Sequence, residues 1–166
     1  MNSFPSRLSF LLLLAAAGVF IVVTSAALPV VVAAHFARGG AADGFMPRDA
    51  YLTLMLGVAI GLPLFVALLS GIVRPLPAQW INLPERKYWL DPERRAETIA
   101  TLERQGMRLA LLLAAYLCFV HRLVVLANSV RPPRLPMPAF IAGNVLFVLA
   151  LVAAIVASAM HFRRRR

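Results

Sequence analysis

The stretch AYLTLMLGVAIGLPLFVALLSGIV, residues 50–73, contains no charged side chain. A helix needs about 20 mostly apolar residues to cross the hydrocarbon core of a bilayer, so this stretch is long enough to span a membrane. Three further stretches are comparably long and apolar: 8–28, 107–127 and 139–162. Because a backbone in lipid must satisfy its own hydrogen bonds, all four should be helical. The sequence therefore predicts an all-α integral membrane four-helix bundle, with residues 1–166 forming a single domain.

The composition of the whole chain points to the same class of protein. Of its 166 residues, 61% are apolar and 14% are charged, and the mean hydropathy is +0.79. A typical soluble domain has about 25% charged residues, and a soluble fold of this size has too little interior for so much apolar surface. The composition therefore excludes a soluble globular enzyme, a disordered chain and a disulfide-stapled secreted domain. The single cysteine, Cys118, lies among apolar residues and is expected to be inert.

The 17 basic residues predict the orientation of the spans. If both termini are cytoplasmic, twelve basic residues face inward, namely Arg7, seven within 74–108, and Arg163–Arg166. Four face outward: Arg38, Arg48, Arg131 and Arg134. Cytoplasmic loops carry the excess of basic residues, so we expect a multi-pass protein of the bacterial inner membrane with both ends in the cytoplasm. The net charge of +10 then suits anionic lipid headgroups, and no nucleic-acid partner is expected.

The first apolar stretch has an alternative interpretation. Arg7, the apolar run and the small residues at 25–27 also suit a secretory signal peptide. The run continues through Val30–Val32, however, and reaches spanning length before any polar break. We therefore favour an uncleaved helix over a cleaved signal.

The outer loop, residues 29–49, contains signals for local structure. Pro29 is followed by the β-branched run Val30–Val32, and Gly39, Gly40 and Asp43-Gly44 supply turn residues. We expect a short strand followed by a turn at the outer surface. The alternative is that Val30–Phe36 extends the first helix.

This outer loop also holds the candidate ligand-binding residues, which are His35, Phe36, Asp43 and Gly44. His35 with Asp43 and Asp49 offers ligand types that zinc accepts. No second His or Cys lies nearby, and no His-Glu-x-x-His pattern occurs, so neither a metal nor another cofactor is expected. We favour a hydrogen bond from His35 that fixes the loop, with pH sensing as an alternative role.

The inner loop, residues 74–106, is predicted to form a cytoplasmic surface helix. Asp91-Pro92-Glu93 is typical of a helix start, with Asp91 as the N-cap and Pro92 in the first position. The helix should run to about Gln105 and could lead past Gly106 into the third span. Its apolar face is too thin for a lipid-inserting anchor. The candidate cytoplasmic contact residues are Asn82, Pro84, Tyr88, Trp89, Glu93, Arg94 and Arg95.

Three polar residues inside the predicted spans are candidates for function: His121, Arg122 and Asn144. An ionisable residue within a span is a functional hypothesis by default. Arg122 lies about 8 Å from the outer helix end, so we favour anchoring at the interface over a buried partner or ligand contact. Its side chain points about 100° away from that of His121, so the two need not share a site. Asn144 is suited to a hydrogen bond with another helix.

Gly57 and Gly61 form a GxxxG pattern in the second span, and Ala150, Ala154 and Ser158 repeat its spacing in the fourth. Small residues at this spacing let two helices approach closely. The contact can lie in a dimer or within the bundle. We expect helix packing within the bundle, because every span needs neighbours.

The motif order in the first half resembles a bacterial membrane domain of unknown function. Leu28-Pro29, His35-Phe36, Gly40, Asp43-Gly44 and a span after Arg48 carry the resemblance, which covers about 8–73. The same type of domain occurs at the N-terminus of SdpI-like immunity proteins, which protect a cell from a secreted killing peptide. The second half, through 82–84, 88–90 and 92–95, looks like small uncharacterised four-span versions. The resemblance implies four helices and an outward loop, and it supplies no catalytic residues.

These features predict a binding, signalling or immunity-like protein that recognises an envelope ligand through its outer loop. A homo-oligomer or a membrane-protein partner is compatible with the helix-packing pattern. A component of a transport system is the first alternative, although no Asp or Glu lies in the spans to support a carboxylate-based pump. A membrane enzyme using His35 and the two aspartates is the weaker alternative, so we expect no enzymatic activity.

Overall fold

The computed structural model describes residues 7–163, and four helices in this range are long and apolar enough to cross a membrane. They are α1 (Arg7–Ser25), α2 (Arg48–Ile72), α4 (Pro92–Asn128) and α5 (Met137–Arg163). The predicted helical architecture with four long apolar helices is therefore confirmed. Arg164–Arg166, part of the basic C-terminus predicted to meet anionic lipid, lie outside the described residues.

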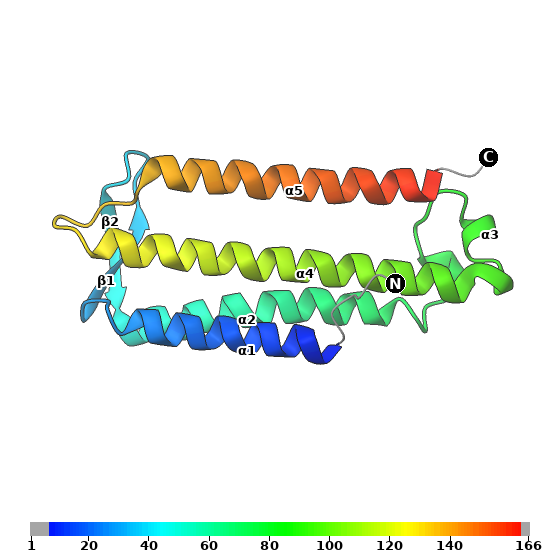
Figure 1. Ribbon diagram of the computed structural model, residues 1–166, viewed down its shortest axis with the longest axis horizontal. Coiled ribbons are helices and arrows are strands. Elements are labelled where there is room, and N and C mark those ends of the chain that lie inside the picture. Colours follow the sequence, from blue (N-terminus) through cyan, green and yellow to red (C-terminus); the bar gives the residue numbers. More distant parts are fainter. Residues whose placement is uncertain (1–6, 164–166) are drawn as a thin grey trace.

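Shorter elements cover the two ends of the bundle (Figure 1). At one end, called the hairpin end, strands β1 (Val31–Phe36) and β2 (Ala42–Pro47) pair antiparallel beside the 129–136 connection. The opposite end, called the loop end, carries residues 73–91 with the 3-10 turn η1 (Ala78–Trp80) and the short helix α3 (Arg86–Trp89). The bundle thus has two chemically different ends.

Helix α4 contains both the predicted surface helix and the third predicted span, in agreement with the possible continuation past Gly106. The expected surface helix and the third span form one continuous helix of 37 residues. Asp91 caps it as predicted, because its carboxylate accepts a hydrogen bond from the Glu93 N–H at 3.1 Å. Gly106 does not end the helix. A Cβ added there would collide with the Ser70 side chain of α2, so this glycine serves close packing of α2 against α4.

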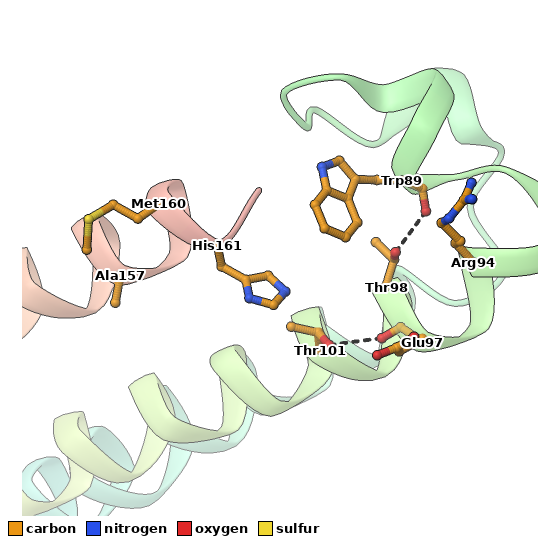
Figure 2. Close-up of a pocket in the computed structure, with 8 residues that line it drawn as sticks. All are labelled: Trp89, Arg94, Glu97, Thr98, Thr101, Ala157, Met160 and His161. Atoms are coloured by element: carbon orange, nitrogen blue, oxygen red, sulfur yellow. Dashed lines mark hydrogen bonds between the residues drawn. The ribbon is translucent and has the colours of Figure 1, made fainter. Parts of the chain in front are cut away.

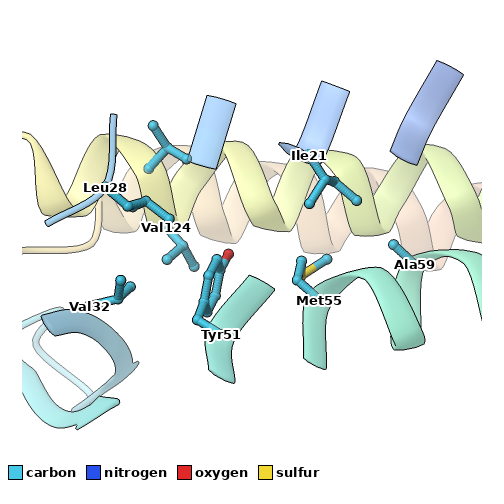
Figure 3. Packing of buried hydrophobic residues seen from close by; sticks show 8 residues of the cluster. Ile21, Leu28, Val32, Tyr51, Met55, Ala59 and Val124 are labelled. Atoms are coloured by element: carbon cyan, nitrogen blue, oxygen red, sulfur yellow. The ribbon is translucent and has the colours of Figure 1, made fainter. Parts of the chain in front are cut away.

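The main core lies where four elements meet beneath the hairpin (Figure 3). It consists of buried residues from α1 and the segment after it, the hairpin, α2 and α4: Ile21, Leu28, Val32, Tyr51, Met55, Ala59, Val124 and Val125. Phe10, Leu14, Ala110 and Ala114 form a second cluster nearer the loop end, and Ile81, Leu90 and Ile99 give that end a small core of its own. Because the hairpin contributes Val32 to the main core, it is built into the bundle.

Helix α5 lies along α4 on the side away from α1 and α2 (Figure 1). Three hydrogen bonds hold it: from the Tyr116 hydroxyl to the Asn144 side chain (2.8 Å), from Ser158 to Gln105 (2.9 Å), and from the Trp89 indole to the Phe162 carbonyl (2.9 Å). The prediction that Asn144 bonds another helix is confirmed. Among its described residues, α5 buries only Phe162, so almost all of its apolar surface is uncovered.

The GxxxG pattern of α2 does not pack within the chain. Gly57 and Gly61 are exposed, and no atom lies within 4 Å of a Cβ added at either position. The expected bundle contact is therefore wrong. The buried residues Tyr51, Met55 and Ala59 follow at four-residue spacing, and a residue two positions further along a helix faces the opposite side. A dimer contact through these glycines stays a prediction.

Candidate functional site

The outer loop forms a β-hairpin closed by a tight turn. Gly40 has a φ of +81°, and its N–H donates to the Ala37 carbonyl at 2.7 Å. The left-handed backbone favours glycine at this position. The predicted short strand and a turn at Gly39-Gly40 are confirmed, and the alternative of a helix extended through Phe36 is wrong. Asp43-Gly44, which was also expected to supply turn residues, lies within β2, so that part of the prediction is wrong. The second strand was not predicted, because its sequence ADGFMP contains few residues with strand preference.

Irregular pairing places His35 beside Asp43. His35 pairs with Gly44, while the next residue, Phe36, pairs with Ala42, so Asp43 has no partner in the ladder. The Nδ1 atom of His35 lies 2.6 Å from Oδ1 of Asp43. Their side chains are 77% and 47% exposed, and an exposed pair contributes only about 0.2–1 kcal/mol. The expected hydrogen bond of His35 is therefore present, and both groups can exchange it for contacts with a ligand at little cost.

Gly44 and Phe36 help to position the His35–Asp43 pair but offer no ionisable group to a ligand. A Cβ added at Gly44 would lie 2.7 Å from the Cβ of His35, so only glycine leaves room for the His35 side chain. Phe36 is partly buried and packs against the main core. Of the four candidate ligand-binding residues, His35 and Asp43 are thus displayed, while Gly44 and Phe36 position them.

Apolar side chains lie exposed on the same hairpin, and sequence reasoning did not identify them as site residues. Val31 is 57% exposed and Phe45 is 56% exposed. Alternation along β2 also exposes Asp43 and Pro47 together with Phe45. The residues of β2 do not alternate in polarity, so only the alternating exposure along the folded strand identifies this face. The hairpin therefore displays an ionisable pair next to apolar groups.

The hairpin is fastened to the helices by Asn128, a residue that sequence reasoning missed. The Asn128 side chain accepts from the Ala33 N–H at 2.9 Å and donates to the Ala33 carbonyl at 3.0 Å. It thereby pairs with β1 as a neighbouring strand would. On the other side, the Leu135 N–H donates to the Gly40 carbonyl at 2.8 Å. These bonds join the hairpin to the end of α4 and to the 129–136 connection that leads into α5.

A buried polar cluster lies directly beneath the hairpin and joins α1, α2 and α4. His121 of α4 is fully buried, with Nε2 at 2.7 Å from the Thr24 hydroxyl and Nδ1 at 2.9 Å from the Tyr51 hydroxyl. The Tyr51 ring stacks on the imidazole, and Phe20 meets its edge. His121 is therefore the hub at which three helices meet. We call His121, Thr24 and Tyr51 the His121 cluster.

The hydrogen bonds of the His121 cluster indicate which of its nitrogen and oxygen atoms carry a hydrogen. The Thr24 hydroxyl donates to the Phe20 carbonyl at 2.6 Å, so it must accept from the Nε2–H of His121. The remaining ring nitrogen, Nδ1, then accepts from the Tyr51 hydroxyl. A neutral imidazole satisfies every bond in the cluster, which suits a buried site where an unpaired charge would be costly.

Arg122 has a different environment from its neighbour. Its side chain is exposed on the outside of the bundle, whereas His121 points into it. The two do not share a site, as the helix geometry predicts. Interfacial anchoring by Arg122 stays a prediction.

The residues predicted to form a cytoplasmic contact mainly hold the loop end together. Arg95 donates to the carbonyls of Arg74 and Leu76, and the Arg94 guanidinium stacks 4.3 Å from the Tyr88 ring centroid. Trp89 contacts the end of α5, as described above. The exposed members of the set are Asn82, Pro84 and Glu93.

One ion pair ties the loop end to α4. The Arg74 guanidinium makes two hydrogen bonds of 3.0 Å to the Glu103 carboxylate. These bonds, and then the negative charge of Glu103, raise the pKa of Arg74 above its ordinary value. The pair therefore remains charged wherever Glu103 is ionised.

No metal centre is evident within residues 7–163, because no group of three His, Cys, Asp or Glu side chains there is placed to bind an ion. Asp49 belongs to the first turn of α2, while the His35 hydrogen bond goes to Asp43. Comparison with family models, with curated proteins and with solved structures finds no match for the chain. Function is therefore inferred from the geometry of the hairpin and of the cluster beneath it.

Proposed function

We propose that the chain is a four-span inner-membrane protein that recognises an envelope ligand with its hairpin and signals binding to its helices. The exposed His35–Asp43 pair on an anchored hairpin carries the proposal, because such groups add little to stability but are available for contact. The resemblance to the N-terminal domain of SdpI-like immunity proteins gives the proposal its biological setting.

Insertion in a membrane is supported by the surface of the helices. None of the most apolar window of α5 is buried, and Leu146, Leu149 and Ile155 are among its exposed side chains. A soluble monomer rarely leaves so large a continuous apolar surface uncovered. Basic residues are concentrated at the loop end, which favours placing that end in the cytoplasm and the hairpin outside.

The ligand that best suits the hairpin is an amphipathic peptide of the envelope. Val31 and Phe45 offer apolar contacts, and Asp43 offers a carboxylate for a basic group.

The hairpin is connected to the His121 cluster by a short route. Strand β2 ends at Pro47, α2 begins at Arg48, and Tyr51 lies in the first turn of α2. A displacement of β2 therefore acts on the Tyr51–His121 hydrogen bond through about one helical turn. For a ligand to produce a signal, it must bind two arrangements of these helices with different affinity.

A deletion strain tests this proposal. The strain is challenged with a panel of membrane-active peptides and with shifts of external pH, and it is complemented with wild type, His35→Ala, Asp43→Asn or Asp49→Asn. We expect wild type and Asp49→Asn to restore growth, and the two hairpin variants to lose most of the protection. Asp49 is the matched control, since it is an exposed carboxylate at the same end of the bundle.

Equal amounts of each variant in the membrane fraction are required, so that loss of protection reports recognition and not abundance. Full protection by both His35→Ala and Asp43→Asn would refute recognition through the hairpin. A deletion strain that grows like the parent under every challenge would also count against the proposal.

A further inference from the structure

The two ends of the bundle differ as candidate binding sites. At the loop end, a cavity of about 420 Å³ lies between α4 and the last turns of α5, with Arg94, Glu97 and His161 among its lining residues (Figure 2). The Arg94 guanidinium lies beyond Thr98, on the far side of the cavity from His161, so these charged groups do not converge on one point. At the hairpin end, by contrast, the backbone of β2 has an edge without a partner.

The register of the hairpin determines which backbone groups of β2 face outward. In an antiparallel pair of strands, hydrogen-bonded and non-hydrogen-bonded positions alternate. The Arg48 N–H donates to the Val30 carbonyl at 2.9 Å, so this position is hydrogen-bonded. Three positions further into the hairpin, Ala33 faces Phe45, and this position is therefore non-hydrogen-bonded. The N–H and the carbonyl of both residues consequently point away from the partner strand.

The outward backbone groups of Ala33 and Phe45 have different surroundings. Those of Ala33 are both bonded by the Asn128 side chain, which agrees with their outward direction. Those of Phe45 have no hydrogen-bond partner within residues 7–163, and Phe45 is 56% exposed. An exposed strand edge with free N–H and carbonyl groups is a template for pairing with a further strand.

The chain itself pairs with the beginning of this edge. The Ala42 N–H donates to the Pro133 carbonyl at 3.4 Å, and the residue before Ala42 forms an antiparallel bridge with Arg134. Pro132 and Pro133 have no N–H to donate, so they cannot continue the pairing along β2. Residues 43–47 are therefore left as a short free edge that already has a strand neighbour at one end.

The exposed side chains of β2 determine what a further strand should carry. They are Asp43, Phe45 and Pro47. A strand that pairs antiparallel with β2, as Arg134 does, places one residue opposite Phe45 and the residue two positions later toward Asp43. An apolar side chain suits the first position, and a basic side chain suits the second, because it can bond the carboxylate.

We propose that β2 binds an extended peptide segment as a third antiparallel strand, in which an apolar residue faces Phe45 and a basic residue two positions later faces Asp43. The proposal rests on the proposed recognition of an envelope peptide by the hairpin, and it specifies the conformation of that peptide. Backbone hydrogen bonds supply affinity in this mode of recognition, and alternate side chains supply specificity. A helical peptide would leave the Phe45 N–H unpaired, because a helix bonds its own backbone groups.

The Phe45 amide signal in an NMR spectrum of the detergent-purified protein reports the pairing directly. The protein is labelled with isotopic phenylalanine and titrated with the synthetic peptide acetyl-Thr-Thr-Val-Thr-Lys-Thr-Thr-amide, and the spectrum of Phe45→Ala assigns the signal. We expect the signal to shift and its exchange with solvent to slow, since the N–H gains an acceptor. An unchanged signal up to millimolar peptide would overturn the proposal.

Methylation of single peptide nitrogens separates strand pairing from other contacts. A methyl group on the valine nitrogen removes the N–H that faces the Phe45 carbonyl, whereas a methyl group on the next threonine replaces an N–H that faces away from β2. We expect the first methylated peptide to bind about tenfold more weakly than the second. Equal binding of the two methylated peptides would refute pairing along the edge.

Two substitutions at Phe45 test the same contact from the side of the protein. Phe45→Ala removes the ring and keeps the N–H, whereas Phe45→Pro removes both. Proline is tolerated on an edge strand where the N–H faces away from the ladder. We expect Phe45→Pro to bind the peptide about tenfold more weakly than Phe45→Ala and to melt at the same temperature. A lower melting temperature of Phe45→Pro would mean that the hairpin itself uses this N–H, which contradicts a free edge.

The deletion strain distinguishes this proposal from the proposed function. We expect Phe45→Pro to lose the protection that Phe45→Ala retains in part. If His35→Ala and Asp43→Asn lose protection while Phe45→Pro keeps it fully, recognition by the hairpin stands and strand pairing is refuted. If wild type itself gives no protection, the proposed function fails, whatever the peptide titration shows.

Discussion

At the scale of single residues, His121 and Arg122 are adjacent in the chain but lie in opposite environments. A helix turns by about 100° per residue, so one side chain enters the bundle while the next leaves it. His121 is tolerated because both ring nitrogens have partners. Arg122 is exposed on the outside of the bundle, where the predicted anchoring would let its long side chain reach the interface.

The His121 cluster leads to a prediction about Thr24. Changing Thr24→Val removes the acceptor of the His121 Nε2–H but keeps the branched shape of the side chain. A buried donor left without a partner costs about 1–3 kcal/mol, so we expect a lower melting temperature of the purified protein in detergent.

The neighbouring residue provides the control for this experiment. The Ser25 hydroxyl is buried and has no hydrogen-bond partner in the described part of the chain, so Ser25→Ala should change stability little. If Thr24→Val melts at the wild-type temperature, the proton assignment in the cluster is wrong.

At the scale of elements, glycine has different roles in different helices. Gly106 of α4 faces Ser70, and Gly143 of α5 faces the Phe119 ring, so neither position has room for a Cβ. Gly57 and Gly61 of α2 face open space. The GxxxG motif therefore makes no close contact within the chain, whereas the isolated glycines Gly106 and Gly143 do. Spacing alone does not say which side of a helix meets its neighbour.

The attachment of the hairpin can be tested through Asn128. Asn128→Ala leaves the N–H and the carbonyl of Ala33 without partners, and Ala33 is fully buried. We expect a loss of about 1–3 kcal/mol for each unsatisfied group, together with faster hydrogen exchange across residues 31–47. Mass spectrometry of exchanged peptides measures this directly.

Ser129→Ala is the matched control for Asn128, since Ser129 is exposed and bonds only the carbonyl of Leu126 in its own helix. Unchanged exchange in the hairpin of Asn128→Ala would mean that the core residue Val32 suffices to hold β1.

At the scale of the whole molecule, the two ends of the bundle's long axis carry different polar groups. The hairpin end presents the His35–Asp43 pair, and the loop end holds most of the basic residues and the charged cavity. Helix α5 adds apolar surface with almost no burial. This arrangement suits a chain whose two ends face different compartments.

Cysteine labelling tests the orientation of the whole molecule. In a Cys118→Ser background, Gly39→Cys lies in the exposed hairpin turn and Ala96→Cys lies on the exposed start of α4. A membrane-impermeant maleimide should label the first in intact cells and the second only after lysis. The reverse pattern would place the hairpin in the cytoplasm and contradict the proposed ligand recognition.

The sequence by itself determined the four long helices, the strand and turn between the first two, and the N-cap at Asp91. These features follow from local chemistry: apolar length, glycine and β-branched residues, and one side chain that bonds its own backbone. The hydrogen bond between His35 and Asp43 could also have been predicted from the sequence, because only eight residues separate the two.

Only the tertiary structure decided which distant residues meet. Asn128 pairs with Ala33 across 95 positions, and Thr24 meets His121 across 97. Local sequence carries no signal for such contacts, since they depend on how helices rotate and slide when they pack. For the same reason the outward direction of Gly57 and Gly61, and the cavity between α4 and α5, became visible only in three dimensions.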